Sequence, residues 1–285
     1  MALPLYSPNR ASPNAIRSIV AVAAGKGGVG KSTVTVNLAL ALKAKGYRVG
    51  IMDTDIYGPS IRKMLPEDRL PSQKNDKIIP ALCAGIKMIS MAYFRRDHEA
   101  AAVRAPIANG LVTQFIKNVE WGELDFLLID FPPGTGDVQL TLSQQANLTA
   151  AIMVTTPQEM ALMDVRRAMD LFYQVKVPIV GVVENMSYYL NNDTPVYIFG
   201  QGGGERLARE KGVPFLGQIP LDPDLCQSGD RGQSLFALDP LHEKKITQAF
   251  MALADQSISH LQVMQQTYLD CLSSFEMTWQ EMEKV

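Results

Sequence analysis

The sequence predicts an α/β fold in which a mostly parallel sheet is flanked by helices. Short apolar runs alternate with helical patterns along most of the chain, as is typical of parallel sheets covered on both faces. A length of 285 residues with 47% hydrophobic content is enough to bury one substantial core. A glycine-rich segment also lies between the first strand pattern and the first helical pattern, where such folds keep their ligands.

Each element follows from its local pattern. Strands are expected at residues 18–24, 48–53, 86–90, 126–130, 150–155, 179–184 and 215–219, which are mainly apolar runs bounded by turn residues. Helices are expected directly after the first strand and at 107–119, 160–174 and 204–211. The polar, proline-bounded run 66–80 is expected to be a surface excursion. We divide the chain into a flexible arm (1–16), one domain (17–256) and an amphipathic helical extension (257–285).

The C-terminal extension carries an apolar stripe at helical spacing. Its members are Leu261, Met264, Tyr268, Leu272, Phe275 and Trp279. Packing on the chain's own domain is the first expectation, and a partner-binding or dimer helix is the second. Four acidic residues against one lysine at the end of the chain argue against binding to an anionic membrane.

The glycine-rich segment matches the phosphate-binding pattern G-x-x-x-x-G-K-[ST]. The predicted nucleotide contacts are Gly25, Lys26, Gly27, Gly28, Val29, Gly30, Lys31, Ser32 and Thr33. Glycines let the backbone N–H groups at the start of a helix surround a phosphate. We expect Lys31 to reach the β- and γ-phosphates of ATP and the Ser32 hydroxyl to ligate Mg²⁺. The alternative, a glycine-rich turn that binds nothing, is disfavoured by the strand before it and the helix after it.

Three aspartates follow predicted strands and complete the site. Asp55 is expected to orient the attacking water, and Asp53 to support Mg²⁺ through water. Asp130 ends an apolar run in the Walker B pattern and is expected to hold the metal shell. Residues 131–137 follow directly and are interpreted as a switch loop that senses the γ-phosphate.

Lys26 and five further motifs carry a family resemblance. The lysine after the first glycine resembles the deviant Walker A ATPases, which include MinD, ParA and the nitrogenase iron protein. The motifs at 55–60, 129–137, 183–188, 198–205 and 219–223 are similar to the Mrp/ApbC family, regarded as carriers or scaffolds for iron–sulfur clusters. The similarity covers roughly residues 17–253. It implies a three-layer P-loop NTPase fold and client apo-proteins or iron–sulfur assembly proteins.

The same resemblance assigns further roles. It implies an ATP-closed homodimer in which Lys26 acts as a catalytic residue on the partner's phosphates, beside Lys31 and Asp55 in their own site. It also implies that Asn185 contacts the adenine, since an amide offers both a donor and an acceptor to a base edge.

The family's Cys-x-x-Cys, whose thiolates hold a bridging [4Fe–4S] cluster, is missing. Asn191 and Thr194 stand where the two cysteines would fall. The cysteines present, Cys83, Cys226 and Cys271, lack metal-ligand spacing, and each is expected to be a small buried apolar residue. No iron–sulfur ligands are therefore identified, and a [4Fe–4S] cluster is doubtful.

The composition argues against two kinds of partner. A net charge of −2 gives no reason to expect binding to nucleic acid. No apolar run reaches the roughly 18 residues that a membrane span needs. Three cysteines without a disulfide framework suit the cytoplasm. Two alternatives stay open: a ParA/MinD-type positioning ATPase, and an ATP-dependent adaptor that carries no cluster.

Overall fold

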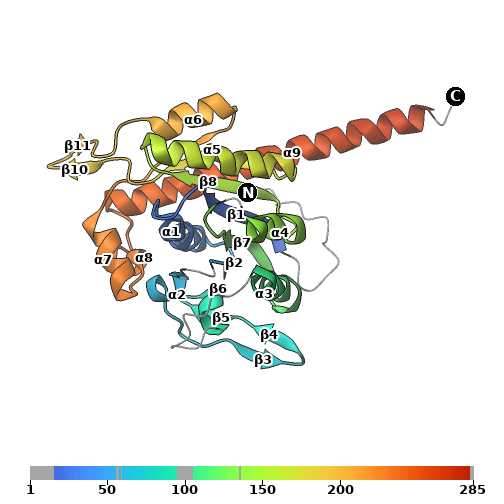
Figure 1. Cartoon of the computed structure of the whole chain (residues 1–285), viewed down its shortest axis with the longest axis horizontal. Helices are drawn as coiled ribbons and strands as arrows, with labels where there is room; N and C mark the ends of the chain where they lie inside the picture. Colours follow the sequence, from blue (N-terminus) through green and yellow to red (C-terminus); the bar gives the residue numbers. More distant parts are fainter. Residues whose placement is uncertain (1–15, 56–57, 59, 95–104, 135, 283–285) are drawn as a thin grey trace.

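The computed structural model describes residues 16–55, 58, 60–94, 105–134 and 136–282. Its centre is an eight-stranded sheet in the order β12-β9-β8-β1-β7-β2-β6-β5 (Figure 1). The strands are β1 (Ile16–Ala24), β2 (Val49–Asp53), β5 (Ala81–Cys83), β6 (Ile86–Ser90), β7 (Leu124–Asp130), β8 (Ala150–Thr155), β9 (Ile179–Glu184) and β12 (Phe215–Gln218). Every neighbouring pair is parallel except β5 and β6. The predicted mostly parallel sheet is confirmed.

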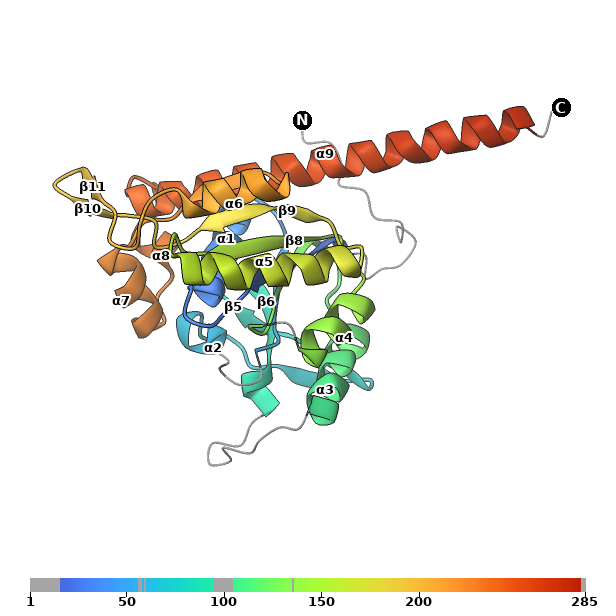
Figure 2. The same ribbon diagram turned by 45° about the horizontal axis from the view of Figure 1, so that its top comes forward.

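Helices cover both faces of the sheet, which gives three layers (Figures 1 and 2). One face packs against α1 (Lys31–Ala44) and the first half of α9 (Lys245–Met282). The other packs against α3 (Ala105–Asn118), α4 (Asp137–Gln145), α5 (Glu159–Gln174) and α6 (Gly203–Lys211). Successive strand residues serve opposite faces: Val20 and Val22 enter the first core, whereas Ala21 and Ala23 enter the second. This explains why both faces of the central strands are mainly apolar.

Two short hairpins lie outside the main sheet. Strands β3 (Ser72–Lys74) and β4 (Lys77–Ile79) pair within the run 66–80, and β10 (Tyr189–Asn191) pairs with β11 (Thr194–Val196). Each turn holds two residues with positive φ: Asn75 and Asp76 in the first, Asn192 and Asp193 in the second. Asparagine and aspartate tolerate this conformation, which two-residue hairpin turns need. Short helices α2 (Ile61–Met64), α7 (Pro223–Arg231) and α8 (Leu235–Leu238) and a 3₁₀ turn (Met91–Phe94) complete the described elements.

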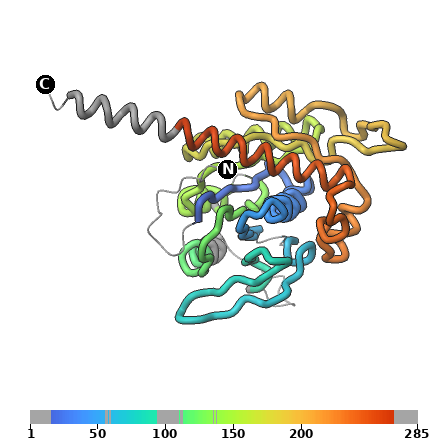
Figure 3. Tube along the Cα trace, turned by 180° about the vertical axis from the view of Figure 1, so that it is seen from behind, coloured from blue at the N-terminus to red at the C-terminus, as the bar shows by residue number. Residues whose placement is uncertain are grey.

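Helix α9 begins earlier than the predicted extension. It starts at Lys245 and is one continuous helix of 38 residues, so position 257 falls in its interior. Phe250, Leu253, Ile258 and Leu261 are buried in the core shared with α1. The later part of the helix extends beyond the rest of the molecule (Figures 1 and 2), and Figure 3 shows the first part of α9 from behind. The predicted stripe from Tyr268 onward concerns side chains outside the described residues. Within the described part of the chain, no helix has the length and apolar character to cross a membrane.

The parallel strands determine where a site can form. Because β1, β2, β7, β8, β9 and β12 run in the same direction, their carboxyl ends meet at one edge of the sheet. Asp53 is paired directly with Asp130 in the β2–β7 register, and Val22 of β1 is paired with Asp130 from the other side. Residues separated by nearly 80 positions in the chain are thereby brought side by side.

Candidate nucleotide-binding site

The phosphate loop connects β1 to α1 at this edge. Gly30, the last residue before α1, has φ 80°, a left-handed conformation that glycine adopts without strain. Among the described residues, no side chain caps the start of α1, and its first turn contains no acidic residue. The N–H groups of that turn are therefore available to an anion.

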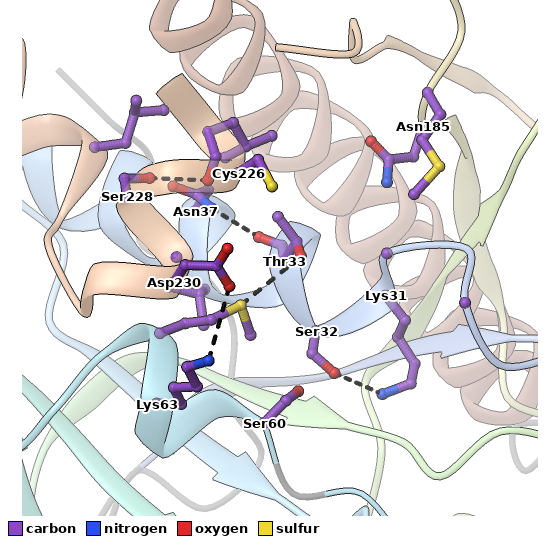
Figure 4. Close-up of a pocket in the computed structure, with 18 of the residues that line it drawn as sticks. Lys31, Ser32, Thr33, Asn37, Ser60, Lys63, Asn185, Cys226, Ser228 and Asp230 are labelled. Atoms are coloured by element: carbon purple, nitrogen blue, oxygen red, sulfur yellow. Dashed lines mark hydrogen bonds and ion pairs between the residues drawn. The ribbon is translucent and has the colours of Figure 1, made fainter. Parts of the chain in front are cut away.

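A buried ion pair lies directly beneath the loop. The Lys31 ammonium is 2.7 Å from Asp130 Oδ1, and both side chains are almost fully buried. The Ser32 hydroxyl donates to Asp130 Oδ2 at 2.6 Å, and Thr35 donates to Oδ1 at 2.9 Å. Lys31 also donates to Ser32 Oγ at 3.2 Å, an interaction visible in Figure 4. The predicted lysine, serine and aspartate are brought together as one cluster.

Asp53 is a second buried carboxylate beside this cluster. Burial and the nearby charge of Asp130 raise the pKa of Asp53 to about 7. Ser90 Oγ donates to Asp53 Oδ2 at 2.8 Å, and the Asp55 backbone N–H donates to Oδ1 at 3.2 Å. Asp55 itself is partly exposed, and its Oδ1 accepts from the Gly58 N–H at 3.1 Å. The segment that follows β2 therefore begins with two local hydrogen bonds.

Asn185 lies on the opposite side of the loop, immediately after β9. Its Nδ2 donates to the Val29 carbonyl at 2.9 Å, and its side chain lines the same cavity as Lys31 (Figure 4). The amide is thus held against the phosphate loop from a strand 156 positions away in sequence.

These residues line a cavity of about 550 Å³, a size typical of small-molecule sites. Its walls include the loop residues Lys26, Gly27, Gly28, Gly30, Lys31, Ser32 and Thr33, together with Asp55 and Asn185. The sequence did not predict the far wall, which is formed by α2, α7 and α8 and includes Lys63, Met64 and Asp230 (Figure 4). One signal was present: Asp222 followed by Pro223 is a helix-start pattern, and Asp222 accepts from the Leu225 N–H at 3.1 Å.

One of the two described cysteines is buried as expected, and the other is exposed. Cys83 is buried as predicted, and burial raises the pKa of its thiol to about 12. Cys226 is exposed and lines the cavity from α7, so its prediction as a buried apolar residue is wrong. It lies in the first turn of the short helix α7, which was not predicted from the sequence. The Cys271 side chain lies outside the described residues.

The donor set fits Mg²⁺. Ser32, Asp53 and Asp130 offer only hard oxygen atoms, which Mg²⁺ prefers. Within the described residues, no group of three His, Cys, Asp or Glu side chains could hold a metal ion. Mg²⁺ in nucleotide sites commonly keeps several waters and is held by one or two protein groups together with phosphate oxygens.

The described residues do not fit an iron–sulfur cluster. Asn191 and Thr194 face each other across the β10–β11 pair, and both are exposed. An amide and a hydroxyl cannot replace the thiolates that such clusters need. Cys83 lies in β5 and Cys226 in α7, so the two described cysteines belong to separate parts of the fold.

Comparison with known proteins now assigns the family. A ParA model described as the NUBPL iron-transfer P-loop NTPase matches residues 15–258. The chain belongs to this family. The iron-sulfur cluster carrier protein of Synechocystis is 42% identical over 257 residues, covering 87% of this chain and 72% of that protein. The predicted Mrp/ApbC resemblance is confirmed.

Solved structures agree on the fold of this P-loop NTPase. A nucleotide-binding protein from Archaeoglobus fulgidus in complex with ADP is 38% identical, with a TM-score of 0.68, and the match covers 76% of this chain and 87% of that one. The septum site-determining protein MinD from Pyrococcus horikoshii, complexed with Mg-ADP, has a TM-score of 0.61 at 23% identity, covering 84% of this chain and 95% of that one. The predicted three-layer P-loop NTPase fold is confirmed.

The raised pKa of Asp53 gives a prediction for the protein without nucleotide. Between its ordinary value near 3.8 and about 7, the carboxyl ionises in the unfolded chain but stays protonated in the fold. The contribution of Asp53 to the free energy of unfolding therefore falls as the pH rises from 3.8 to about 7, and it stays constant at higher pH. Asp53→Asn, which mimics the protonated form, should stabilise the protein more at pH 8 than at pH 5 in urea unfolding with a chelator present.

Asp125→Asn is the matched control, since it also neutralises a buried carboxylate. Asp125 accepts from Arg48 Nε at 3.1 Å, so its loss should destabilise the protein. An equal effect of Asp53→Asn at both pH values would contradict the predicted ionisation.

Proposed function

We propose that the chain is a Mg²⁺-dependent ATPase that works as a nucleotide-switched homodimer in iron–sulfur cluster transfer or assembly. The buried Lys31–Asp130–Ser32 cluster at the start of α1 is the observation that carries the ATPase part. The cluster part rests on the family and on relatives named iron-sulfur cluster carrier proteins. We place this function in the cytoplasm, with apo-proteins or iron–sulfur assembly proteins as clients, and with neither nucleic acid nor membrane as a partner.

When phosphate binds, Lys31 exchanges its ion pair with Asp130 for an ion pair with the phosphates. Without nucleotide, the ammonium of Lys31 is neutralised by Asp130 at 2.7 Å. Ser32 and Asp130, with Asp53 acting through water, would hold the Mg²⁺, which neutralises phosphate charge. With Asp130 so engaged, Lys31 is free to turn toward the phosphates beside the N–H groups of α1.

Hydrolysis needs an oriented water and a stabilised charge. Asp55 stands at the carboxyl end of β2, on the wall of the cavity, where its carboxylate can accept a hydrogen bond from the attacking water. Lys26 also lines the cavity and is partly buried. In a dimer, its ammonium would stabilise the transferring phosphoryl group of the partner.

Asn185 is proposed to select the base. One N–H of its Nδ2 donates to the Val29 carbonyl, which fixes the amide, and its oxygen would accept a hydrogen bond from an adenine amino group. A guanine offers a carbonyl at the same place on its ring and would be disfavoured.

The iron–sulfur cluster is proposed to lie away from the β10–β11 hairpin, or to take ligands from a partner protein. Asn191 and Thr194 supply no thiolate, and the thiol of Cys83 is buried with a pKa of about 12. This chain would therefore drive transfer with its nucleotide site while another protein completes the cluster site.

The first functional prediction separates binding from turnover. Lys31→Ala should abolish tight ATP binding because it removes the charge partner of the phosphates. Asp55→Asn should bind ATP normally and lose hydrolysis by about 10²-fold or more, the scale of a lost acid–base or water-orienting group. Calorimetry measures binding, and phosphate release measures turnover. Wild-type hydrolysis in Asp55→Asn would show that Asp55 does not orient the water.

The second concerns action between subunits. Lys26→Ala should bind ATP and hydrolyse it poorly. Mixing it with Asp55→Asn should restore part of the activity, because one subunit of a mixed pair then has an intact site completed by an intact lysine. A protein that stays monomeric with saturating ATP and Mg²⁺, measured by light scattering, would refute the dimer.

The third concerns the cluster. Reconstitution without oxygen should give the wild-type chain little iron or acid-labile sulfide. The double change Asn191→Cys with Thr194→Cys should raise both, because two thiolates are then placed in register on the hairpin. About one stable [4Fe–4S] per wild-type dimer, with absorbance near 400 nm, would contradict this and point to unidentified ligands.

A further inference from the structure

Glu184 is a buried carboxylate next to Asn185 that the proposed reaction does not use. It is the last residue of β9 and is fully buried. Its Oε1 accepts from Ser187 Oγ at 2.5 Å and from Gln218 Nε2 at 3.1 Å, and its Oε2 accepts from the Gly204 N–H at 2.5 Å. Three donors therefore hold this buried carboxylate in one position.

The three donors come from three elements that surround the end of β9. Gly204 lies in the first turn of α6, where a negative charge is favoured by the helix N-terminus. Gln218 ends β12, the neighbouring strand. Ser187 begins the segment that leads into the β10–β11 hairpin. The contact with α6 is close, since a Cβ atom on Gly204 would lie 2.9 Å from Glu184 Cβ.

Backbone hydrogen bonds connect the surroundings of Glu184 to the nucleotide pocket. The Ile219 N–H donates to the Glu184 carbonyl at 2.9 Å, and the Ser187 N–H donates to the Ile219 carbonyl at 3.0 Å. The Asn185 N–H donates to the Thr155 carbonyl of β8 at 2.8 Å. The two adjacent side chains therefore make different contacts: Glu184 accepts from the start of α6, whereas Asn185 donates to the phosphate loop at Val29.

We propose that Glu184 is a positioning residue for base selection. Its carboxylate fixes the peptide between β9 and the hairpin and so holds the Asn185 amide in line with the base, without touching the nucleotide. This inference rests on the proposed function, in which ATP binds and Asn185 faces its base. It predicts that ATP selectivity depends on a residue that lies on the α6 side of the strand.

Glu184→Gln tests this with little change of shape. A glutamine has one acceptor oxygen, so its NH₂ group must face at least one of the donors that the carboxylate now satisfies. Titration calorimetry with Mg²⁺ would compare ATP, GTP and inorganic tripolyphosphate. We expect ATP affinity to fall about tenfold, the equivalent of one lost hydrogen bond, and the preference for ATP over GTP to shrink. Tripolyphosphate affinity should fall much less, because Lys31, Ser32 and the N–H groups of α1 stay in place.

A double-variant cycle shows through which residue the effect passes. If Glu184 acts by holding Asn185, then adding Glu184→Gln to Asn185→Ala should cause no further loss of ATP affinity. Losses that multiply in the double variant would overturn the proposal. Equal losses of ATP and tripolyphosphate affinity would also overturn it, since they would indicate general damage to the fold.

Two further variants keep the test decisive. Ser187→Ala removes one donor and leaves the carboxylate, so it should reduce ATP preference in the same direction even if Glu184→Gln fails to fold. Unchanged selectivity in folded Ser187→Ala and Glu184→Gln would overturn the proposal.

Asp125→Asn is the matched control: Asp125 accepts from the Arg48 N–H at 2.9 Å at the start of β7, the opposite edge of the sheet. It should lower stability and leave base selectivity unchanged. A wild-type chain that binds tripolyphosphate but not ATP would instead contradict the proposed function itself.

Discussion

The carboxylate of Asp130 is the group around which the candidate site is organised. It has no exposure to solvent, and a buried charge is costly unless it is paired and hydrogen bonded. Lys31 supplies the counter-charge, and Ser32 and Thr35 supply hydroxyl donors. Its backbone carbonyl also accepts from Thr54 Oγ1 at 2.7 Å. One residue therefore joins the end of β7 to the start of α1 and to the segment after β2.

The neighbouring Asp53 adds a second buried acidic group next to Asp130. Two buried carboxylates in paired positions of β2 and β7 repel each other, and one lysine cannot neutralise both. Burial and, after it, the charge of Asp130 raise the pKa of Asp53. A divalent cation relieves it better than a second lysine could, since it brings two charges into a small volume. Without a cation, protonation of Asp53 relieves part of the repulsion.

The sequence predicted the near side of the site and missed the far side for a physical reason. Lys31, Asp53 and Asp130 each stand next to an apolar run, so the topology of a parallel sheet was enough to bring them together. Met64 and Asp230 lie on short polar helices whose positions depend on packing between α2 and α7, which no local pattern records. The exposure of Cys226 and the start of α9 at Lys245 were not predicted for the same reason. The turn at Asn192 and Asp193 did carry a local signal that is typical of two-residue hairpins.

The two ends of the sheet limit how copies of this chain can associate. At one end β5 has three residues, runs against β6 and bridges to Arg69, which covers part of its outer side. At the other, β12 has four residues and its register shifts between Phe215 and Gly217. Long, regular edge strands invite pairing with another molecule and growth into aggregates, whereas short or irregular ones discourage it. Within the described residues, both edge strands are therefore poor templates for strand addition, which disfavours association of copies through a continuous sheet.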